Sequence, residues 1–229
     1  MRIPLTKYGW PEVVVLPAGC LAVMLILLVL GPNFLPGSFI LVTEIVLLAV
    51  LIWLLAFFRD PERAVPQNTN ILLAPADGKI TDIEIVQVDS FIVGKALRIG
   101  IFMNIFNVHV NRSPCPVTVE KIIYRKGRFK NAMGPASGRV NESNDLFLLR
   151  LDEPRDKLLV RQISGAIARR IVCTAKQGQN LAGGEKFGMV KFGSRAELYL
   201  PVRENVKCLV KVGDNVKAGL TILVKYERT

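Results

Sequence analysis

The sequence predicts a mainly β (β-rich α+β) soluble domain preceded by an N-terminal two-helix membrane hairpin. Three observations predict this fold class. The first 58 residues hold only four Asp, Glu, Lys or Arg side chains, whose charges cancel. The formal net charge of +11 therefore lies in residues 59–229. Short β-branched runs separated by Gly, Pro, Asn and Asp fill that second part, without a long amphipathic helix pattern.

The hairpin is predicted from two apolar segments, residues 13–30 and 39–58. The first carries no charge and the second only Glu44. As helices they would be roughly 27 and 30 Å long, which matches a hydrocarbon core of about 30 Å. Two Gly and two Pro lie between the segments, and these residues end helices. We expect residues 1–60 to anchor the chain in a membrane. A signal peptide and a buried soluble hairpin fit the lengths and spacing less well.

Charged residues around the hairpin predict its orientation. The connecting loop has no Lys or Arg, whereas both ends of the hairpin carry them. The positive-inside rule then puts the soluble domain on the cytoplasmic side of the cell (inner) membrane. Glu44 is either an interfacial residue or a pairing residue in a homo-oligomer.

The soluble part, residues 61–229, is expected to meet anionic membrane. In residues 59–229, 28 basic side chains face 17 acidic ones. Nucleic acid is the other usual partner of such charge, but the apolar N-terminal segment argues against it, and we expect no nucleic acid. Five basic residues are candidates for attracting an anionic lipid, although each would also fit a solvated surface: Arg59, Arg63, Arg125, Lys126 and Arg128.

Strands are expected wherever short β-branched or aromatic runs lie between turn residues. Ten such runs are Ile80–Val88, Phe91–Val93, Leu97–Phe102, Val117–Tyr124, Leu146–Leu151, Leu158–Ile163, Arg169–Cys173, Met189–Phe192, Ala196–Leu200 and Leu220–Tyr226. A short helix is expected near Asn104–Val108. Residues 74–80 and 210–223 have lipoyl/biotinyl-like β-sandwich features, with tight turns at Gly213 and Gly219.

Three positions are candidates for chemistry. His109 is the only histidine in the chain, and strand alternation would put it on a polar face with Asn107 and Asn111. Asp77 follows a Pro-Ala pair, and Gly193-Ser194 lies between two strand-like runs. Taken singly, they fit a solvated imidazole, a turn-capping carboxylate and a tight turn. The four cysteines form no CxxC pair, so no metal is expected.

Taken together, these motifs resemble the phosphatidylserine decarboxylase proenzymes, in their short bacterial-type form. The resemblance covers nearly all of residues 57–229. The motifs that carry it are Phe57-Phe-Arg-Asp-Pro-Glu-Arg63, Pro75-Ala-Asp-Gly78, Val108-His-Val110, Tyr124-Arg-Lys-Gly-Arg-Phe-Lys-Asn-Ala132, Asn141-Glu142 and Lys191-Phe-Gly-Ser-Arg195. The last is the most specific, because longer members of the family carry Gly-Ser-Thr where this chain has Gly-Ser-Arg.

The resemblance implies a self-cleaving, pyruvoyl-dependent enzyme. The Gly193–Ser194 bond would break, giving fragments 1–193 and 194–229 that stay together as a heterodimer. Ser194 would become a covalent pyruvoyl group, the only cofactor, which takes the substrate amine into a Schiff base and accepts electrons as CO2 leaves. His109 would be the base that activates Ser194, with Asp77 as its orienting carboxylate.

The implied reaction converts phosphatidylserine to phosphatidylethanolamine and CO2 at the membrane surface. Longer family members carry a second His at the position of Phe106, so the proton donor after decarboxylation is open. Two other functions fit parts of the sequence. One is a non-enzymatic membrane-tethered lipoyl-like adaptor, and the other is a pyruvoyl decarboxylase of a soluble amino acid.

Overall fold

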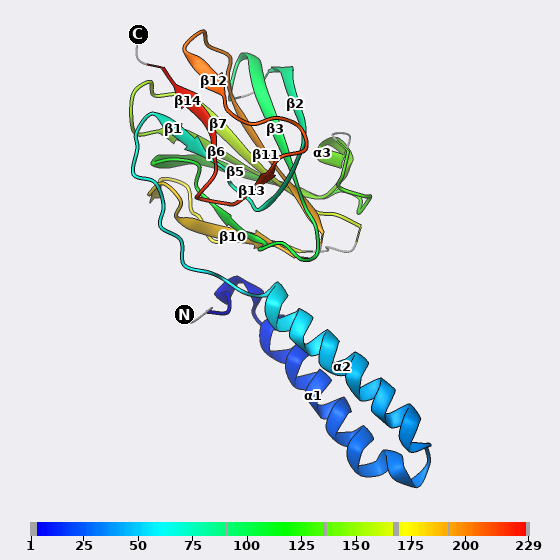
Figure 1. Ribbon diagram of the computed structural model, residues 1–229. Helices are drawn as coiled ribbons and strands as arrows, with labels where there is room; N and C mark the ends of the chain where they lie inside the picture. The colour runs from blue at the N-terminus through cyan, green and yellow to red at the C-terminus, as the bar shows by residue number, and fades with distance from the viewer. Residues whose placement is uncertain (1–3, 90, 135–136, 167–169, 192, 228–229) are drawn as a thin grey trace. The chain divides into compact units, whose positions relative to one another are not determined.

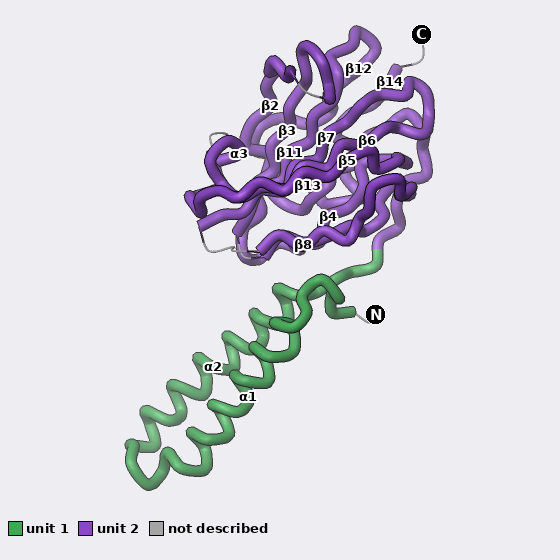
Figure 2. The backbone as a smooth tube through the Cα atoms, turned by 180° about the vertical axis from the view of Figure 1, so that it is seen from behind, with its two compact units in different colours: residues 1–62 green, residues 63–229 purple. Residues whose placement is uncertain are grey.

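The computed structural model describes residues 4–89, 91–134, 137–166, 170–191 and 193–227. Two compact units are present, residues 1–62 and residues 63–229, which are coloured separately in Figure 2. The first unit is helical and the second is mainly β, as the sequence predicts.

The first unit is an antiparallel helical hairpin (Figure 1). A short 3-10 turn, η1 (Lys7–Gly9), precedes α1 (Glu12–Leu30), and η2 (Gly31–Asn33) leads into α2 (Gly37–Phe57). Both predicted helices are confirmed to within two residues at each end. By length and composition, both are apolar enough to cross a membrane. Most of their apolar side chains point outward, among them Leu25, Val29 and Leu41, which suits lipid as the surrounding solvent.

The second unit contains fourteen strands and one short helix among the described residues. Their bounds are β1 Ile71–Leu73, β2 Gly78–Val88, β3 Gly94–Met103, β4 Val110–Arg112, β5 Val117–Arg125, α3 Ser137–Val140, β6 Ser143–Arg150, β7 Lys157–Ile163, β8 Ile171–Cys173, β9 Asn180–Leu181, β10 Lys186–Val190, β11 Ser194–Pro201, β12 Val206–Cys208, β13 Asn215–Val216 and β14 Ile222–Tyr226.

The strands form three antiparallel sheets (Figure 1). The largest has the order β13-β2-β3-β11-β7-β6-β5-β9, and two small sheets have the orders β4-β10-β8 and β1-β14-β12. Side chains alternate across each strand. On β11, Ala196, Leu198 and Leu200 point into the main hydrophobic core, which also contains Met103 and Val190.

Strand β11 lies in the middle of the large sheet. It pairs with β3 from Ser194↔Met103 to Pro201↔Ala96, and with β7 from Arg195↔Ile163 to Tyr199↔Leu159. The strand that begins at Ser194 is therefore held on both sides by strands that precede it in the chain.

The two segments with lipoyl-like features lie side by side. The amides of Gly213 and Gly219 donate to the carbonyls of Ile80 and Ala74, and the amide of Ala74 donates to Thr221. Both glycines have positive φ, +100° and +69°, a conformation that favours glycine.

Two predicted elements are wrong. Residues 91–93 form a bend, not a strand. Residues 104–108 form a turn, not a helix, because asparagine side chains bind the backbone: Asn107 Oδ1 accepts from the Asn104 amide and Asn104 Oδ1 from the Phe106 amide. Two other predicted strands, Arg169–Cys173 and Met189–Phe192, each have one end outside the described residues. These ends are Arg169 and Phe192.

Candidate active site

The turn after β3 and the connection before β11 run beside each other. Met103, the last residue of β3, pairs with Ser194. His109, at the far end of the turn, accepts a hydrogen bond through its carbonyl from the amide of Val190, 3.4 Å away. The fold thereby brings the segment that carries the only histidine alongside the Gly193–Ser194 bond.

Gly193 and Ser194 occupy a constrained, largely buried position. Gly193 has a φ of +65°, which residues with a side chain rarely adopt. Ser194 is fully buried, and its Oγ lies 3.8 Å from the Met103 Sδ. Its side chain shares the core face of β11 with Ala196, so the hydroxyl points into the protein.

Gly165 packs directly against the carbonyl of Gly193. A Cβ built on Gly165 would lie 1.9 Å from the Gly193 oxygen, far inside van der Waals contact. The absence of a side chain at Gly165 is therefore what leaves room for this carbonyl group. No sequence pattern distinguishes Gly165 from the other glycines, because its partner lies 28 residues away in the chain.

An apolar cavity opens at Gly193. Its volume is about 350 Å³. Residues from four segments line it: Phe102, Asn104, Ile105, Asn131, Ala132, Met133, Ala166 and Gly193. Clefts of this kind, with apolar walls, are usual for organic ligands.

Asn141 holds two walls of this cavity together. Its side-chain amide donates to the carbonyls of Lys130, at 2.7 Å, and Ser164, at 2.8 Å, and its Oδ1 accepts from the Lys130 amide. Lys130 precedes Asn131, which lines the cavity, and Ser164 precedes Gly165, which packs against Gly193. Asn141 belongs to one of the motifs that carry the family resemblance, but only the structure shows that it joins two walls of this cavity.

His109 is fully buried, and its tautomer is set by a backbone group. The ring Nδ1 lies 3.0 Å from the carbonyl oxygen of Asn107. Because a carbonyl only accepts hydrogen bonds, Nδ1 is the nitrogen that donates in this bond. The neutral ring then carries its lone pair on Nε2, the form that a general base requires.

The described contacts of Asp77 are with Arg63 and Ala218 rather than with the imidazole of His109. Arg63 donates to both carboxylate oxygens, at 2.6 and 2.8 Å, and the Ala218 amide donates to Oδ1 at 2.7 Å. The orienting role of Asp77 thus stays a prediction. For Arg63, the expectation of a solvated, lipid-attracting cation is wrong, because its side chain is 5% exposed and paired with Asp77.

The loop of Asp77 nevertheless connects to the segment of His109. The carbonyl of Pro75 accepts hydrogen bonds from the Arg112 amide at 3.0 Å and from the Asn111 side chain at 3.4 Å. The Asp77–Arg63 ion pair thus lies in a loop that is hydrogen-bonded, through Pro75, to the strand that follows His109, and we call this connection the brace.

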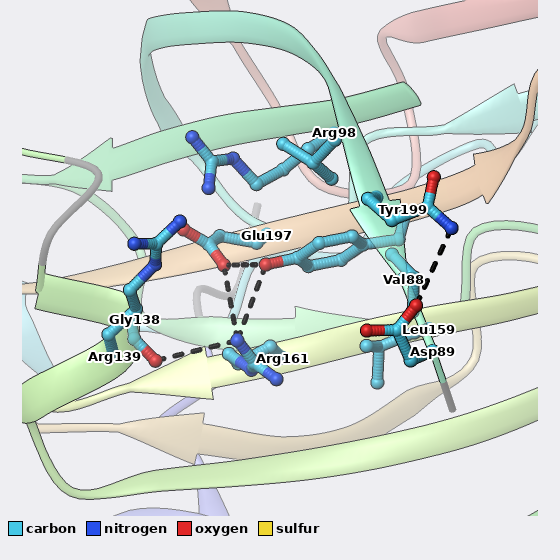
Figure 3. Close-up of a pocket in the computed structure, with 11 residues that line it drawn as sticks. Val88, Asp89, Arg98, Gly138, Arg139, Leu159, Arg161, Glu197 and Tyr199 are labelled. Carbon is cyan, nitrogen blue, oxygen red and sulfur yellow. Dashed lines mark hydrogen bonds and ion pairs between the residues drawn. The ribbon is translucent and has the colours of Figure 1, made fainter. Parts of the chain in front are cut away.

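The outer face of the large sheet carries an ion network beside a polar pocket of about 220 Å³. In Figure 3, the Glu197 carboxylate points toward the Tyr199 hydroxyl, which donates to it at 2.6 Å, and toward Arg161, 4.0 Å away. Burial raises the pKa of Tyr199, and the charge of Glu197 raises it further. Sequence reasoning missed this network, because its members lie on strands that are distant in the sequence, such as β7 and β11.

Comparison with known proteins decides the family. The sequence profile of the phosphatidylserine decarboxylase family matches residues 50–224. The chain belongs to this family. A phosphatidylserine decarboxylase proenzyme of Rhodopirellula baltica is 39% identical over 229 residues, covering 99% of this chain and 90% of the relative. A proenzyme of the same name from Nitrosomonas europaea is 40% identical, covering 97% and 95%. That of Desulfotalea psychrophila is 46% identical, covering 74% and 77%.

Membership of the phosphatidylserine decarboxylase family confirms the predicted resemblance. The chain is a decarboxylase made as a proenzyme, so the hypothesis of a non-enzymatic adaptor is excluded. The matched range contains every predicted site residue: Asp77, His109, Gly193 and Ser194. It also contains Phe106, which is 66% exposed on the turn that lines the cavity.

Proposed function

We propose that this protein cleaves itself between Gly193 and Ser194 and then decarboxylates phosphatidylserine to phosphatidylethanolamine and CO2. One observation carries the proposal. Gly193 has a left-handed conformation, its carbonyl lies against Gly165, and an apolar cavity opens beside it. Cleavage needs the carbonyl of the scissile bond to be held in a fixed position next to its nucleophile.

Self-cleavage begins when the Ser194 hydroxyl attacks the Gly193 carbonyl carbon. The hydroxyl proton passes to the base, the C–N bond breaks, and the nitrogen leaves as a free amine, so that an ester joins the fragments. Removal of the Cα proton of residue 194 then expels the Gly193 carboxylate and leaves dehydroalanine. Its hydrolysis by water yields a pyruvoyl group and ammonia.

His109 is the proposed base of this sequence. Its Nε2 is the acceptor nitrogen when Nδ1 donates to Asn107. With Ser194 and His109, Asp77 is the proposed third member of a triad. It acts on the His109 segment through the contacts of the loop that carries Asp77. Phe106 has no acidic proton, so we propose that water or His109 itself protonates the product.

The surroundings of residue 194 fit a pyruvoyl group. The position is buried, its neighbour Met103 is uncharged, and the adjoining cavity has apolar walls. When present, this ketone supplies an electron sink for the bond that loses CO2. The chain's own residues hold the group at the head of β11. No metal enters the proposal.

The apolar hairpin suits a lipid substrate. We propose that α1 and α2 anchor the protein in the inner membrane, with the catalytic unit on the cytoplasmic side, where anionic lipid attracts its basic surface. The fragments 1–193 and 194–229 would remain a heterodimer, and copies of it are free to form a homo-oligomer.

Mass analysis of the purified protein tests the proposal. We expect two chains on a denaturing gel, 1–193 and 194–229, with the shorter one carrying a ketone in place of its N-terminal amine. Ser194→Ala should remain one chain and lose all decarboxylase activity. An uncut wild-type chain, or a free serine at the new N-terminus, would contradict the proposal. Turnover of free serine but not of phosphatidylserine vesicles would instead favour a soluble amino acid as substrate.

A pair of variants tests how Asp77 acts. If Asp77 orients His109 directly, Asp77→Asn slows self-cleavage while Arg63→Met leaves it close to the wild-type rate. If Asp77 acts through the brace described above, both variants slow cleavage to a similar degree, because each breaks the same ion pair. We expect the second result, with a reduction of about 10-fold in each. The rate of appearance of fragment 194–229 on a gel measures both.

A further inference from the structure

Arg195 follows the proposed cleavage site, yet its side chain points away from it. Strand alternation puts Ser194 on the core face of β11 and Arg195 on the outer face. Arg195 is fully buried there, with Glu197 and Tyr199 on the same face. It therefore does not touch the reacting atoms, and any role in the reaction runs through the backbone of β11.

The guanidinium of Arg195 is bound on three sides. Its Nη2 donates to both oxygens of Asp82, at 2.5 and 2.8 Å, its Nη1 to the Thr81 hydroxyl at 2.6 Å, and its Nε to Glu197 at 2.8 Å. Burial opposes the charge of Arg195, but Glu197 and Asp82 more than compensate, so its pKa lies above the ordinary value. Because each of the three donor nitrogens is bound to a different residue, the position and the orientation of the guanidinium are both fixed.

The fold makes room for this contact and keeps its acceptors in place. A Cβ on Gly100 would lie 1.9 Å from the Arg195 Nη2. Arg98 lies 3.4 Å from Asp82, and the Tyr199 hydroxyl holds Glu197 (Figure 3). Asp82, Thr81 and Gly100 all belong to residues 1–193, so the contact joins the two proposed fragments next to the cut.

Cleavage changes what holds residue 194. Before it, the peptide bond to Gly193 fixes this residue from one side. Afterwards residue 194 is a chain end, and chain ends fray unless they are tied down. A pyruvoyl end also lacks the ammonium of an ordinary N-terminus, so it cannot form an ion pair of its own. The nearest charged side chain of the new fragment is Arg195.

We propose that Arg195 is the positioning residue that holds the new N-terminus in register after cleavage. The proposal rests on the proposed cleavage at Gly193–Ser194. Arg195 ties the second residue of fragment 194–229 to β2 of the larger fragment, which keeps the reactive group at the cavity. An error of about 1 Å at a reacting group lowers rates by up to about 100-fold.

The test compares Arg195→Met and Arg195→Lys with Arg161→Met as the matched control. Arg161 is a second arginine of the same network, bound to Asp145 at 2.6 and 2.9 Å. We expect Arg195→Met to be cut but to lose 10- to 100-fold in kcat per cut chain, with KM for phosphatidylserine within about 2-fold. Arg195→Lys should recover part of kcat, and Arg161→Met should keep most of it.

Hydrogen exchange supplies a second measurement if Arg195→Met folds poorly. In the cut wild-type protein, the amides of β11 should be as protected as in uncut Ser194→Ala, and Arg195→Lys should lose protection at the start of the strand first. Full kcat in cut Arg195→Met, an equal loss in Arg161→Met, or a folded Arg195→Met that stays uncut would each overturn the inference. An uncut wild-type chain would instead overturn the proposed function.

Discussion

Gly165→Ala is expected to stop self-cleavage almost completely. The added methyl group would lie 1.9 Å from the Gly193 carbonyl oxygen, so this carbonyl or the backbone of Gly165 must move. The scissile carbon then leaves the line of attack of Ser194, and such misplacement lowers rates by about 100-fold. The fraction of cut chain against time after synthesis, followed on a denaturing gel, measures the effect.

Gly134→Ala is the matched control for Gly165→Ala. Gly134 lies beside the cavity residue Met133, and a Cβ there would meet nothing within 4 Å. We expect this variant to be cut at the wild-type rate. Rapid cleavage of a folded Gly165→Ala protein would show that the Gly193 carbonyl need not stay where it lies in the structure.

His109→Ala is expected to slow self-cleavage by about 10²- to 10⁴-fold, the usual contribution of a general base. The serine hydroxyl would have to lose its proton to water or to a weaker base. His109→Gln should be equally slow, because an amide of similar size has no basic nitrogen. The measurement is again the rate at which fragment 194–229 forms.

Thermal unfolding separates chemistry from folding in the His109 variants. Ser194→Ala, which is also uncut, provides the reference melting temperature. His109→Gln should melt close to this reference and yet remain one chain. Cleavage of His109→Gln at the wild-type rate would exclude the imidazole as the base.

The two-part architecture was predictable from short-range patterns. Continuous apolar stretches of membrane length predict α1 and α2 without reference to the rest of the chain, and the long strands follow from β-branched runs. The turn at Asn104–Asn107 was missed because two side chains, rather than apolar periodicity, decide its backbone. Very short strands such as β9 and β13 exist only because a longer partner strand lies beside them.

The candidate site was predictable only in part. Gly193, Ser194, His109 and Asp77 stand out by residue type and by family resemblance. Gly165 and the partners of Arg195 carry no such signal, because their importance comes from contacts across strands that are distant in sequence. The ion pair between Asp77 and Arg63 was not predicted either, because the sequence does not distinguish Arg63 from the other basic residues of the soluble part.

The central position of β11 in the large sheet has a consequence for the order of folding and cleavage. Both neighbours of this strand, β3 and β7, come from the portion of the chain made before it. Under the proposed cleavage, the polypeptide would therefore reach its folded state while still continuous, and the chemistry at Ser194 would follow. Once cut, a denatured molecule would have to recapture its middle strand from free solution. The proposed cleavage would thus leave a protein that can no longer refold from one continuous chain.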